Sequence, residues 1–255
     1  MPMSKKGTTA FEHAQKKMKF SELAGKLRAY LSTLDSDGEN RLTQRAYLAL
    51  RHAIRHLILP PGQTVLEREI AEMLDMSRTP VREALVRLEM EGWVRLIPRR
   101  GFIVAPLLAD ELQQIYEVVE ALDGLAGSLA TLRATPEELD RIEQLIAEQE
   151  KALANDDLLT WTELDDQFHD SIIDLAHNPR LRSIVDSQAD QLYRVRLYTI
   201  HLRPKPVLSV LEHKAILAVM RAKKPEAARA MMQAHRSRSC KEILEVLRST
   251  PQMAI

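Results

Sequence analysis

The chain has 255 residues and carries 36 Lys and Arg against 36 Asp and Glu, so its formal net charge is zero. Its length suggests two domains, and its 45% hydrophobic and 28% charged residues are typical of a soluble globular protein, which excludes a disordered chain. The one cysteine, Cys240, excludes an intramolecular disulfide and a cysteine-based zinc finger. The zero net charge leaves nucleic-acid binding open, because a basic domain and an acidic domain can cancel in the sum.

Targeting, membrane and phosphate-loop signals are missing from the sequence. The first 20 residues are positively charged but lack the apolar core of a secretory signal. No stretch approaches 18 apolar residues without charge, so we expect no membrane span and no membrane partner. The eight glycines form neither G-x-G-x-x-G nor G-x-x-x-x-G-K. We therefore expect a cytoplasmic protein.

Residues 1–41 start basic and polar and end in the breaker DSDGEN, which begins at Asp35. We expect a partly ordered N-terminal arm here. The alternative is one amphipathic helix over Phe20 to Leu34, where apolar residues recur at helical spacing.

Residues 42–106 have the pattern helix, turn, helix, turn, helix, hairpin. The first helix has an apolar stripe that ends before Pro60-Pro61-Gly62. The stripe consists of Leu50, Ile54, Leu57 and Ile58. The remaining elements are expected over Glu67 to Leu74, Arg78 to Glu91, Val94 to Ile97 and Phe102 to Ala105. Ser77 is the expected N-cap of the third helix, and Ala71, Val81, Leu85 and Leu88 suit the inner faces of a helix–turn–helix.

The third helix would expose Arg78, Thr79, Arg82 and Arg87. Three of these lie in its first turn and a half, the part of a recognition helix that reaches base edges in the major groove. Arg99 and Arg100 at the hairpin tip would reach phosphates or a neighbouring groove. A solvated basic face is the alternative interpretation, but the order of the helices and the placement of the arginines favour DNA binding.

The run LEREIAEMLDMSRTPVREALVRLEMEGWVRLIPRRGFIV, from Leu66 to Val104, closely resembles the winged helix–turn–helix of the GntR family of bacterial transcription regulators. The resemblance implies a DNA-binding regulator, most often a repressor relieved by a metabolite, that binds operator DNA as a homodimer. It also implies that the wing glycine and one arginine before the turn contact DNA. The predicted DNA-binding set is Arg68, Ser77, Arg78, Thr79, Arg82, Arg100 and Gly101.

Residues 110–249 carry only helical patterns, about six of them, and predict an all-helical antiparallel bundle. The fold class is therefore mainly α, with an N-terminal winged helix–turn–helix and a C-terminal bundle. Residues 1–108 hold 18 basic and 12 acidic residues, and the remainder holds 18 and 24. The neutral total thus combines a basic DNA-reading half with an acidic half.

Four polar residues of the bundle fall on inward-facing positions of three helices. Asp165 and His169 stack at i, i+4 spacing, and His213 and His235 each lie on an apolar face. A divalent cation would satisfy this set: three imidazoles and one carboxylate suit Zn²⁺, and also Ni²⁺, Cu²⁺ or Fe²⁺. The alternative is that these are hydrogen-bonded core residues, with Asp165 paired to His169.

The bundle resembles the FCD ligand-binding domain of the FadR-type branch of the GntR family, in which D-x-x-x-H on one helix and single histidines on two later helices recur. DDQFH, EHKAIL and MQAHRS match that order. The resemblance implies a metal at the base of a cavity for a small organic acid. Many relatives carry an Arg where YEVVEALD places Val119, so Arg194 and Arg196 are the candidate effector-binding residues.

Two alternatives remain open at this point. In the first, the chain is a metal-free regulator whose histidines bind the effector directly. In the second, it is a metal-dependent hydrolase, although no H-E-x-x-H motif occurs and a DNA-binding domain would be unexplained. We expect a regulator and not an enzyme.

Overall fold

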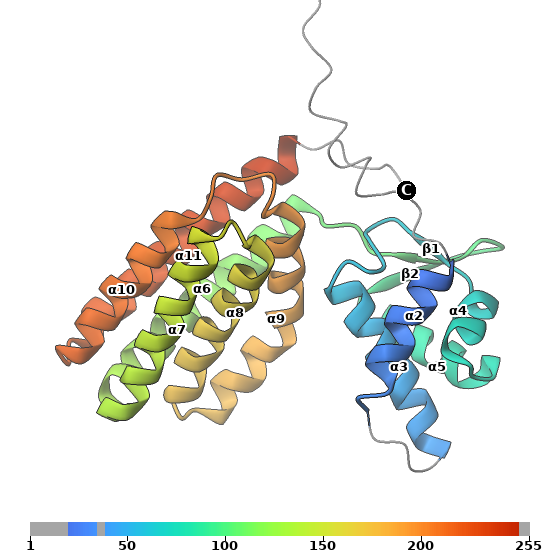
Figure 1. Ribbon diagram of the computed structural model, residues 1–255, viewed down its shortest axis with the longest axis horizontal. Coiled ribbons are helices and arrows are strands. Elements are labelled where there is room, and N and C mark those ends of the chain that lie inside the picture. Colours follow the sequence, from blue (N-terminus) through green and yellow to red (C-terminus); the bar gives the residue numbers. More distant parts are fainter. Residues whose placement is uncertain (1–19, 35–38, 250–255) are drawn as a thin grey trace, which may run out of the picture. The chain divides into compact units, whose positions relative to one another are not determined.

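The computed structural model of the chain describes residues 20–34 and 39–249 (Figure 1). It divides into two compact units, Met1–Ala105 and Pro106–Ile255. The first holds helices and a small sheet, and the second holds helices throughout its described part. This confirms the expected mainly α fold, with a winged helix–turn–helix followed by a helical bundle.

In the part that the structure describes, the first unit combines four helices with a three-stranded antiparallel sheet. The helices are α2 (Phe20–Leu31), α3 (Glu39–Arg55), α4 (Glu67–Leu74) and α5 (Arg78–Met90). The strands are β1 (Thr64–Val65), β2 (Val94–Ile97) and β3 (Gly101–Val104), in the order β1-β3-β2. The hairpin of β2 and β3 was predicted, whereas β1 was not. Two residues leave no periodic signal, and β1 exists because Thr64 and Val65 pair with Ile103 and Phe102 of β3.

Helix α2 corrects the prediction of a partly ordered arm for its part of the chain, while residues 1–19 lie outside the described residues. Its buried Leu23, Leu27 and Leu31 join the core of the first unit. The Arg28 guanidinium donates hydrogen bonds to the carbonyls of Glu72 and Met73, at 3.0 and 2.7 Å. These are carbonyls of the last turn of α4, where carbonyls outnumber the helical N–H groups available to them, and Glu72 otherwise accepts only the long 3.4 Å bond from the Asp75 amide among the described residues. The alternative helical interpretation was therefore the correct one for this stretch.

Helix α3 ends at Arg55, so two members of the predicted stripe, Leu57 and Ile58, lie beyond it. Leu57 adopts a left-handed conformation with φ of 56°. The Leu59 amide then donates to the Ala53 carbonyl at 2.9 Å and closes the helix end. The chain thus turns before the proline pair, and Leu59 rather than Leu57 is buried.

The second unit is an antiparallel bundle whose six described helices agree with the predicted number. They are α6 (Ala109–Arg133), α7 (Pro136–Ala154), α8 (Leu158–Leu175), α9 (Pro179–Thr199), α10 (Val207–Arg221) and α11 (Pro225–Ser249). Side chains that accept backbone hydrogen bonds begin three of them: Thr135 at α7, Asp157 at α8 and Asn178 at α9. None of the helices in the described ranges is long and apolar enough to cross a membrane.

Helices α6 and α11 pack closely along their length. A Cβ added at Gly127 of α6 would lie 2.9 Å from the Met232 side chain and 3.3 Å from the Ala228 carbonyl oxygen. Helix α6 also contributes to two apolar clusters, through Val119 in one and Ala126 in the other. The buried Asp123 lies between Val119 and Ala126 in sequence. A buried acidic residue therefore lies where the two apolar clusters meet along α6.

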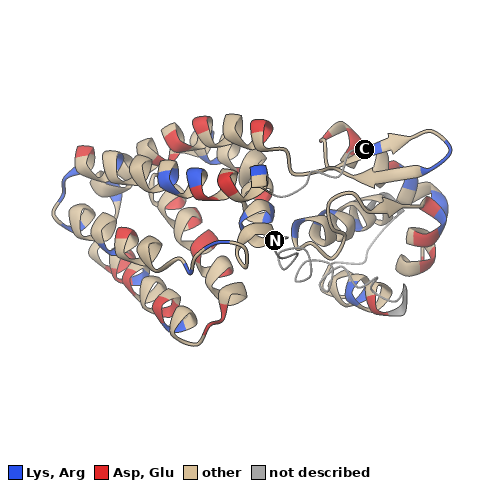
Figure 2. Cartoon of the chain, turned by 90° about the horizontal axis from the view of Figure 1, so that it is seen from above, with Lys and Arg blue, Asp and Glu red and all other residues tan. Residues whose placement is uncertain are grey.

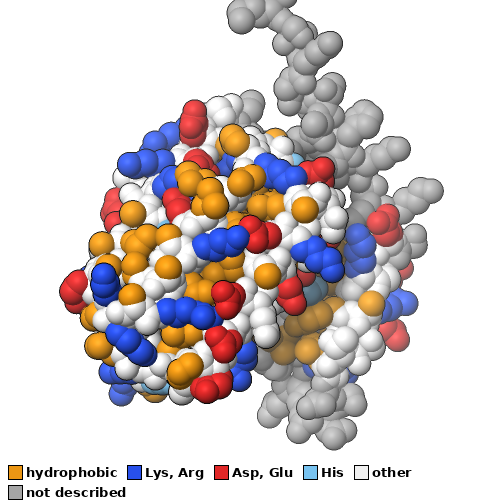
Figure 3. All heavy atoms as spheres, turned by 60° about the vertical axis from the view of Figure 1, so that its left-hand side comes forward, with side chains coloured by type: hydrophobic (Ala, Val, Ile, Leu, Met, Phe, Trp, Pro, Cys, Tyr) orange, Lys and Arg blue, Asp and Glu red, His pale blue; other side chains and the backbone are white. Residues whose placement is uncertain are grey.

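The outside of the bundle mixes apolar and charged side chains. Figure 3 shows hydrophobic side chains scattered among acidic and basic ones over one face. On α10, Val207, Leu208 and Leu211 are each about half exposed. Single exposed apolar residues are normal on a soluble protein, so this surface alone does not identify an interface.

Candidate DNA interface and metal centre

The turn between α4 and α5 is tight and presents the start of α5 to solvent. Asp75 ends α4 in a left-handed conformation with φ of 54°, and Met76 is half-buried. Ser77 then occupies the predicted N-cap position, but its hydroxyl makes no capping hydrogen bond within the described chain. The exposed hydroxyl is thus free of a helix-capping role.

Helix α5 separates a buried face from an exposed basic face. Pro80, Val81, Ala84, Leu85 and Leu88 are buried against the first unit. The predicted contacts Arg78, Thr79 and Arg82 are exposed, as is Arg68 on α4. Arg82 has only a long ion pair, with its Nε 3.9 Å from Glu67 Oε1. An exposed pair of this length is weak, so Arg82 can turn toward another partner.

Arg87 belongs to the structure of the domain. Its guanidinium donates hydrogen bonds to Gln44 Oε1 at 2.8 Å and Glu91 Oε1 at 3.0 Å, and it lies 3.7 Å from the centre of the Tyr47 ring. These contacts join α5 to α3. The sequence predicts Arg87 as an exposed residue of α5. Its contacts to α3 depend on the tertiary structure and leave no signal in the helical pattern.

The wing carries its basic residues at the hairpin tip, as Figure 2 shows for the loop between β2 and β3. Arg99 and Arg100 are exposed, and Arg99 has a φ of 65°. Gly101 has a φ of 89°, and a Cβ there would lie 2.7 Å from Leu66 Cδ2 and 2.9 Å from the Val65 carbonyl oxygen. The turn and its packing against the start of α4 therefore require glycine whatever Gly101 contacts in DNA.

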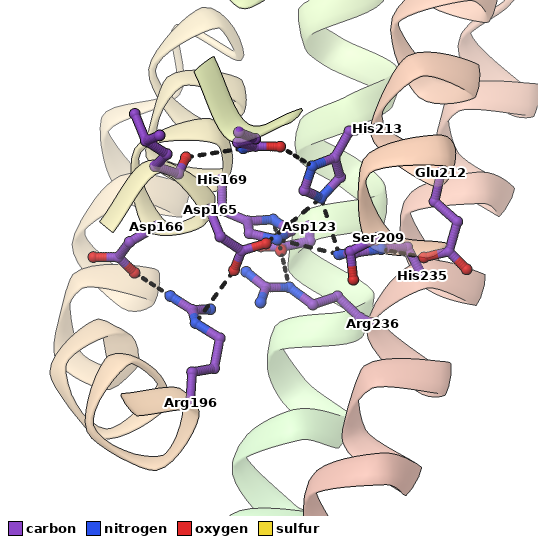
Figure 4. Close-up of polar contacts among 12 residues, drawn as sticks. Asp123, Asp165, Asp166, His169, Arg196, Ser209, Glu212, His213, His235 and Arg236 are labelled. Carbon is purple, nitrogen blue, oxygen red and sulfur yellow. Dashed lines mark hydrogen bonds and ion pairs between the residues drawn. The ribbon is translucent and has the colours of Figure 1, made fainter. Parts of the chain in front are cut away.

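The four predicted metal ligands come together in the bundle. Asp165 and His169 on α8, His213 on α10 and His235 on α11 are all buried, and one ligand atom from each lies within 4.8 Å of the others. His235 Nε2 is 3.3 Å from His169 Nε2 and 3.4 Å from His213 Nε2. His213 Nε2 is 3.7 Å from Asp165 Oδ1. Figure 4 shows these side chains pointing toward one another, Asp165 and His169 from α8 and the two other histidines from α10 and α11.

The other nitrogen of each imidazole faces a different acceptor. His213 Nδ1 lies 2.8 Å from Gln149 Oε1, and His235 Nδ1 lies 2.6 Å from Glu212 Oε2. His169 Nδ1 lies 3.4 Å from Asp123 Oδ2 but makes no hydrogen bond within the described residues. A nitrogen that hydrogen-bonds to an oxygen acceptor carries the proton in a neutral imidazole, so the Nε2 lone pairs of His213 and His235 face the centre of the cluster.

Gln149 fixes the tautomer of His213 with particular clarity. Its Nε2 donates to the Leu164 carbonyl at 3.0 Å, which leaves its Oε1 to accept from His213. Burial, followed by the positive charge of neighbouring side chains, lowers the pKa of both His213 and His169 well below 6.5. Both rings are therefore neutral at pH 7 and able to bind a metal without first losing a proton.

The donor set fits a divalent transition metal. Three imidazole lone pairs and one carboxylate oxygen converge, and without a cation these four acceptors would face each other in a buried space. Bonds of about 2.0–2.1 Å in a tetrahedral site place neighbouring donors about 3.3–3.4 Å apart. The separations of His235 Nε2 from His169 Nε2 and His213 Nε2 have that value.

Buried ion pairs surround this cluster. Arg196 Nε lies 3.4 Å from Asp165 Oδ2, and the same guanidinium pairs with Asp166. Burial alone would lower the pKa of Arg196, but the adjacent Asp166 and Asp165 raise it above its ordinary value. On the far side, Arg236 Nε lies 2.5 Å from Asp123 Oδ2. The Asp166 side chain is mostly buried because its partner Arg196 draws it toward the bundle interior.

The two candidate effector-binding arginines differ in position. Arg196 lines a small cavity together with Asp123, His169 and Arg236. Arg194 is fully buried but is not among the residues that line this cavity, and burial lowers its pKa to about 10. Val119 is fully buried in an apolar cluster, as its side chain requires.

Sequence reasoning missed four residues of this site: Asp123, Gln149, Glu212 and Arg236. A weak signal existed for two of them. Gln149 continues the buried stripe Leu139, Ile142 and Ile146 of α7 at helical spacing. Asp123 does the same after Tyr116 and Val119 on α6. A polar residue on an apolar stripe needs a partner, and that expectation would have flagged both.

Two family models match the chain. The model described as bacterial regulatory proteins of the gntR family matches residues 42–104. The FCD domain model matches residues 114–238. All four predicted metal ligands lie within the second range.

Curated relatives and solved structures agree with these models. The uncharacterized HTH-type transcriptional regulator YdhC of Bacillus subtilis is 31% identical over 79% of this chain and 90% of its own length. The Nta operon transcriptional regulator of Aminobacter aminovorans is 31% identical over 74% and 88%. The solved structure of E. coli McbR/YncC has a TM-score of 0.69 at 23% identity, covers 80% of this chain and 97% of its own, and supports the fold alone.

These relatives are named as transcription regulators and not as enzymes, which confirms the expectation that the chain is not an enzyme. The range of the gntR model includes the exposed basic residues of α5 and of the wing. The chain is a DNA-binding transcription regulator of the GntR family, with an FCD domain as its C-terminal part.

Proposed function

We propose that the chain controls transcription in response to a small carboxylate that binds beside a metal ion in the bundle. The observation that carries this proposal is the convergence of three imidazole Nε2 atoms and Asp165 Oδ1 in a buried cluster. Such a cluster is costly without a cation, and Zn²⁺ suits its ligands best, with Ni²⁺ or another divalent transition metal as alternatives. A carboxylate oxygen of the effector would complete the coordination sphere of the metal.

The DNA-binding part of the proposal assigns operator contacts to the exposed residues of α4, α5 and the wing. Arg78 and Arg82 would bond to base edges or phosphates in the major groove, and Arg68 and Arg100 would contact the backbone. Ser77, Thr79 and Gly101 complete the proposed set. All but Gly101 have exposed side chains, which supports the assignment.

We propose a homodimer that binds a pseudo-palindromic operator in the cytoplasm, since dimeric helix–turn–helix proteins match two half-sites with two recognition helices. Repression that the effector relieves is the proposed sign of regulation. Its support is a relative named as a repressor: the HTH-type transcriptional repressor RspR of Escherichia coli is 26% identical over 83% of this chain. A ligand that binds one conformation more tightly would shift the population of operator-competent dimers.

The metal-free alternative assigns the histidines directly to the effector. It would leave three lone pairs and a carboxylate facing each other in the absence of ligand, which is why we favour the metal. The hydrolase alternative has no support in the names of the relatives.

The experiment is an electrophoretic mobility shift with the untagged chain and a fragment of its own promoter at low salt. The full chain is compared in its metal-loaded and chelator-treated forms, with and without a panel of small carboxylates. We expect a shifted complex that at least one carboxylate weakens, and only in the metal-loaded form. No shift in any of these samples would overturn the proposed operator binding, and an effector response that survives chelation would overturn the role of the metal.

A further inference from the structure

Helix α2 belongs to the first unit but lies outside the part of it that the family model matches. The gntR model covers residues 42–104, whereas α2 covers Phe20–Leu31. One face of α2 is buried in the core of the unit, through Leu23, Leu27 and Leu31, and the helix packs against both α3 and α4. The matched range thus omits a helix that the core of this DNA-binding unit includes.

Two contacts hold α2 to α3. The Tyr30 ring of α2 stacks on the His52 ring of α3, with 3.8 Å between the ring centres. Arg45 of α3 donates a hydrogen bond from Nη2 to the Leu31 carbonyl at 3.1 Å, and so satisfies a carbonyl at the end of α2. Because α2 is fixed to α3 in this way, it can hold α4 from a defined position.

Arg28 connects α2 to the end of α4. Its Nε donates to the Met73 carbonyl at 2.7 Å, and its Nη2 donates to the Glu72 carbonyl at 3.0 Å. The C-terminal end of a helix carries a partial negative charge, and hydrogen bonds from a charged donor are stronger than neutral ones. Helix α4 ends one residue later, at Leu74, so Arg28 binds directly beside the turn that leads into α5.

The turn beside Arg28 includes a residue in a costly conformation. Asp75 has a φ of 54°, a left-handed conformation that favours glycine over residues with a Cβ. Its amide donates to the Ala71 carbonyl and, over a long 3.4 Å, to the Glu72 carbonyl. Ser77 follows at the start of α5 and makes no capping hydrogen bond among the described residues. The position of the start of α5 therefore depends on how firmly the end of α4 is held.

We propose that Arg28 is a positioning residue for operator binding. From α2 it holds the last turn of α4, and this keeps the start of α5 in the orientation that reads DNA. Arg28 does not contact DNA itself, since its Nε and Nη2 atoms are used by the carbonyls of α4. The inference rests on the proposed operator contacts of α5, and it adds to them a helix that the family model does not match.

The test compares Arg28→Met with the wild type in the full chain. Methionine keeps an apolar stem but donates no hydrogen bond, so the turn is free to populate conformations that do not fit DNA. We expect the affinity for a fragment of the chain's own promoter, measured by fluorescence anisotropy, to fall about three- to tenfold. Hydrogen exchange at the Asp75 and Met76 amides, which both donate to the Ala71 carbonyl, should become faster. Unchanged affinity or unchanged exchange would each overturn the proposal.

The salt dependence of binding separates positioning from direct contact. Arg28→Met should leave the slope of log affinity against log salt concentration unchanged, because no phosphate contact is lost. Loss of one phosphate contact would lower the slope by about one unit. A slope lowered by that amount would show that Arg28 binds DNA directly and would overturn the positioning role.

Two control variants separate positioning from a general loss of stability. Lys26→Met removes a cation of α2 that pairs with Glu22 of the same helix. Tyr47→Phe removes the hydrogen bond from the Tyr47 hydroxyl to Glu91 Oε2, 2.7 Å long, and so destabilises the same unit without touching the turn. Both should bind the operator within about twofold of the wild type, because nearly all molecules stay competent. A loss in Tyr47→Phe equal to that in Arg28→Met would overturn the proposal.

Asp75→Gly tests the connection between Arg28 and the turn. Glycine adopts the left-handed conformation at little cost, so a turn with Gly should need less support. We expect Arg28→Met to lower the affinity by about twofold or less in the Asp75→Gly background. The same loss in both backgrounds would overturn the connection. If Arg28→Met fails to fold, Arg28→Lys takes its place in every comparison, because lysine keeps the charge and loses the two-pronged donor.

The outcomes also separate this inference from the proposed function. A wild-type chain that binds the operator, together with Arg28→Met of equal affinity, would overturn the positioning role and leave operator binding in place. A wild-type chain that binds no operator would overturn both, even where hydrogen exchange at the turn is faster in the variant.

Discussion

At the scale of single residues, the chemistry of the candidate site depends on partners that face away from the proposed metal position. Gln149 and Glu212 each hydrogen-bond to the Nδ1 atom of one histidine and so direct its Nε2 atom inward, whereas Asp123 lies 3.4 Å from His169 Nδ1. Burial would raise the pKa of Glu212, but hydrogen bonds from His235 and Arg238 lower it to about 2, so it remains a charged acceptor. Residues that hydrogen-bond to the far side of a metal-binding histidine hold its ring in the orientation that metal binding needs.

Replacing Gln149 with leucine tests this role. The leucine fills a similar volume but cannot accept from His213 Nδ1, so the ring is free to adopt the wrong tautomer. We expect zinc affinity, measured by competition with a chelating dye, to fall about 10–100-fold while the helical content is unchanged. Gln113→Leu is the control, because Gln113 is an exposed residue of α6. An unchanged affinity in Gln149→Leu would contradict the positioning role.

The arginines of α5 allow a second test at this scale. Arg78→Ala removes an exposed side chain and should weaken operator binding by about 1–3 kcal/mol without changing the stability of the protein. Arg87→Ala breaks the contacts to Gln44, Glu91 and Tyr47 and should destabilise the first unit by roughly 1 kcal/mol. Fluorescence anisotropy with operator DNA and urea unfolding measure the two effects. Equal loss of stability in both variants would refute the division of roles.

At the scale of elements, the sequence patterns predicted the helices and strands whose positions depend on local periodicity. Residues 67–74 form α4 as expected, and α5 and the wing hairpin differ from prediction by about one residue. Tertiary contacts determined the rest: β1 needs β3, α3 ends at a left-handed Leu57, and Arg28 and the leucines of α2 anchor that helix to its neighbours. The cluster of Asp165 and three histidines was predictable from helical phase, whereas Arg236 was not, since its partner Asp123 lies 113 residues away.

The end of α3 makes the stability of the first unit dependent on pH. Burial, followed by the charges of His52 and Arg55, lowers the pKa of His56 to about 4, and the Arg55 guanidinium lies 3.1 Å from His56 Nε2. Burial also lowers the pKa of His52, whose ring stacks on Tyr30 of α2 at 3.8 Å. A lowered pKa in the folded state means that the unfolded state binds more protons below pH 6.5. Stability is therefore complete above about pH 6.5 and is lost as the pH falls toward about 4.

This pH dependence can be followed in the whole chain with Trp161→Phe, which leaves Trp93 of the first unit as the only tryptophan. Urea unfolding monitored by Trp93 fluorescence should show a lower midpoint at pH 5 than at pH 7. The loss should shrink when His56→Gln is added, because glutamine does not titrate. A midpoint that is independent of pH over this range would show that these histidines are not held neutral by the fold.

At the scale of the whole molecule, the neutral charge sum conceals a division of labour. The first 108 residues carry a net charge of +6 and the remainder −6. Positive charge is thus concentrated where operator DNA binds, and the bundle carries the opposite sign, which discourages it from binding the phosphate backbone. The family assignment gives the same division, with the gntR model on residues 42–104 and the FCD model on residues 114–238.

Salt dependence measures this division. The logarithm of operator affinity should fall linearly with the logarithm of salt concentration, and Arg68→Ala should reduce the slope by about one unit if Arg68 contacts a phosphate. Lys214→Ala in the bundle, where Lys214 pairs with Glu150, should leave the slope unchanged. A Lys214→Ala slope as low as that of Arg68→Ala would mean that the bundle contacts DNA.

The metal content of the untagged full chain tests the central claim most directly. Elemental analysis of protein purified without affinity chromatography, followed by a zinc titration monitored by thermal unfolding, gives both stoichiometry and linkage. The account predicts about one divalent transition metal per chain, and loss of both metal and thermal stabilisation in His213→Ala. Less than about a tenth of an equivalent, with no thermal shift on adding zinc, would contradict it.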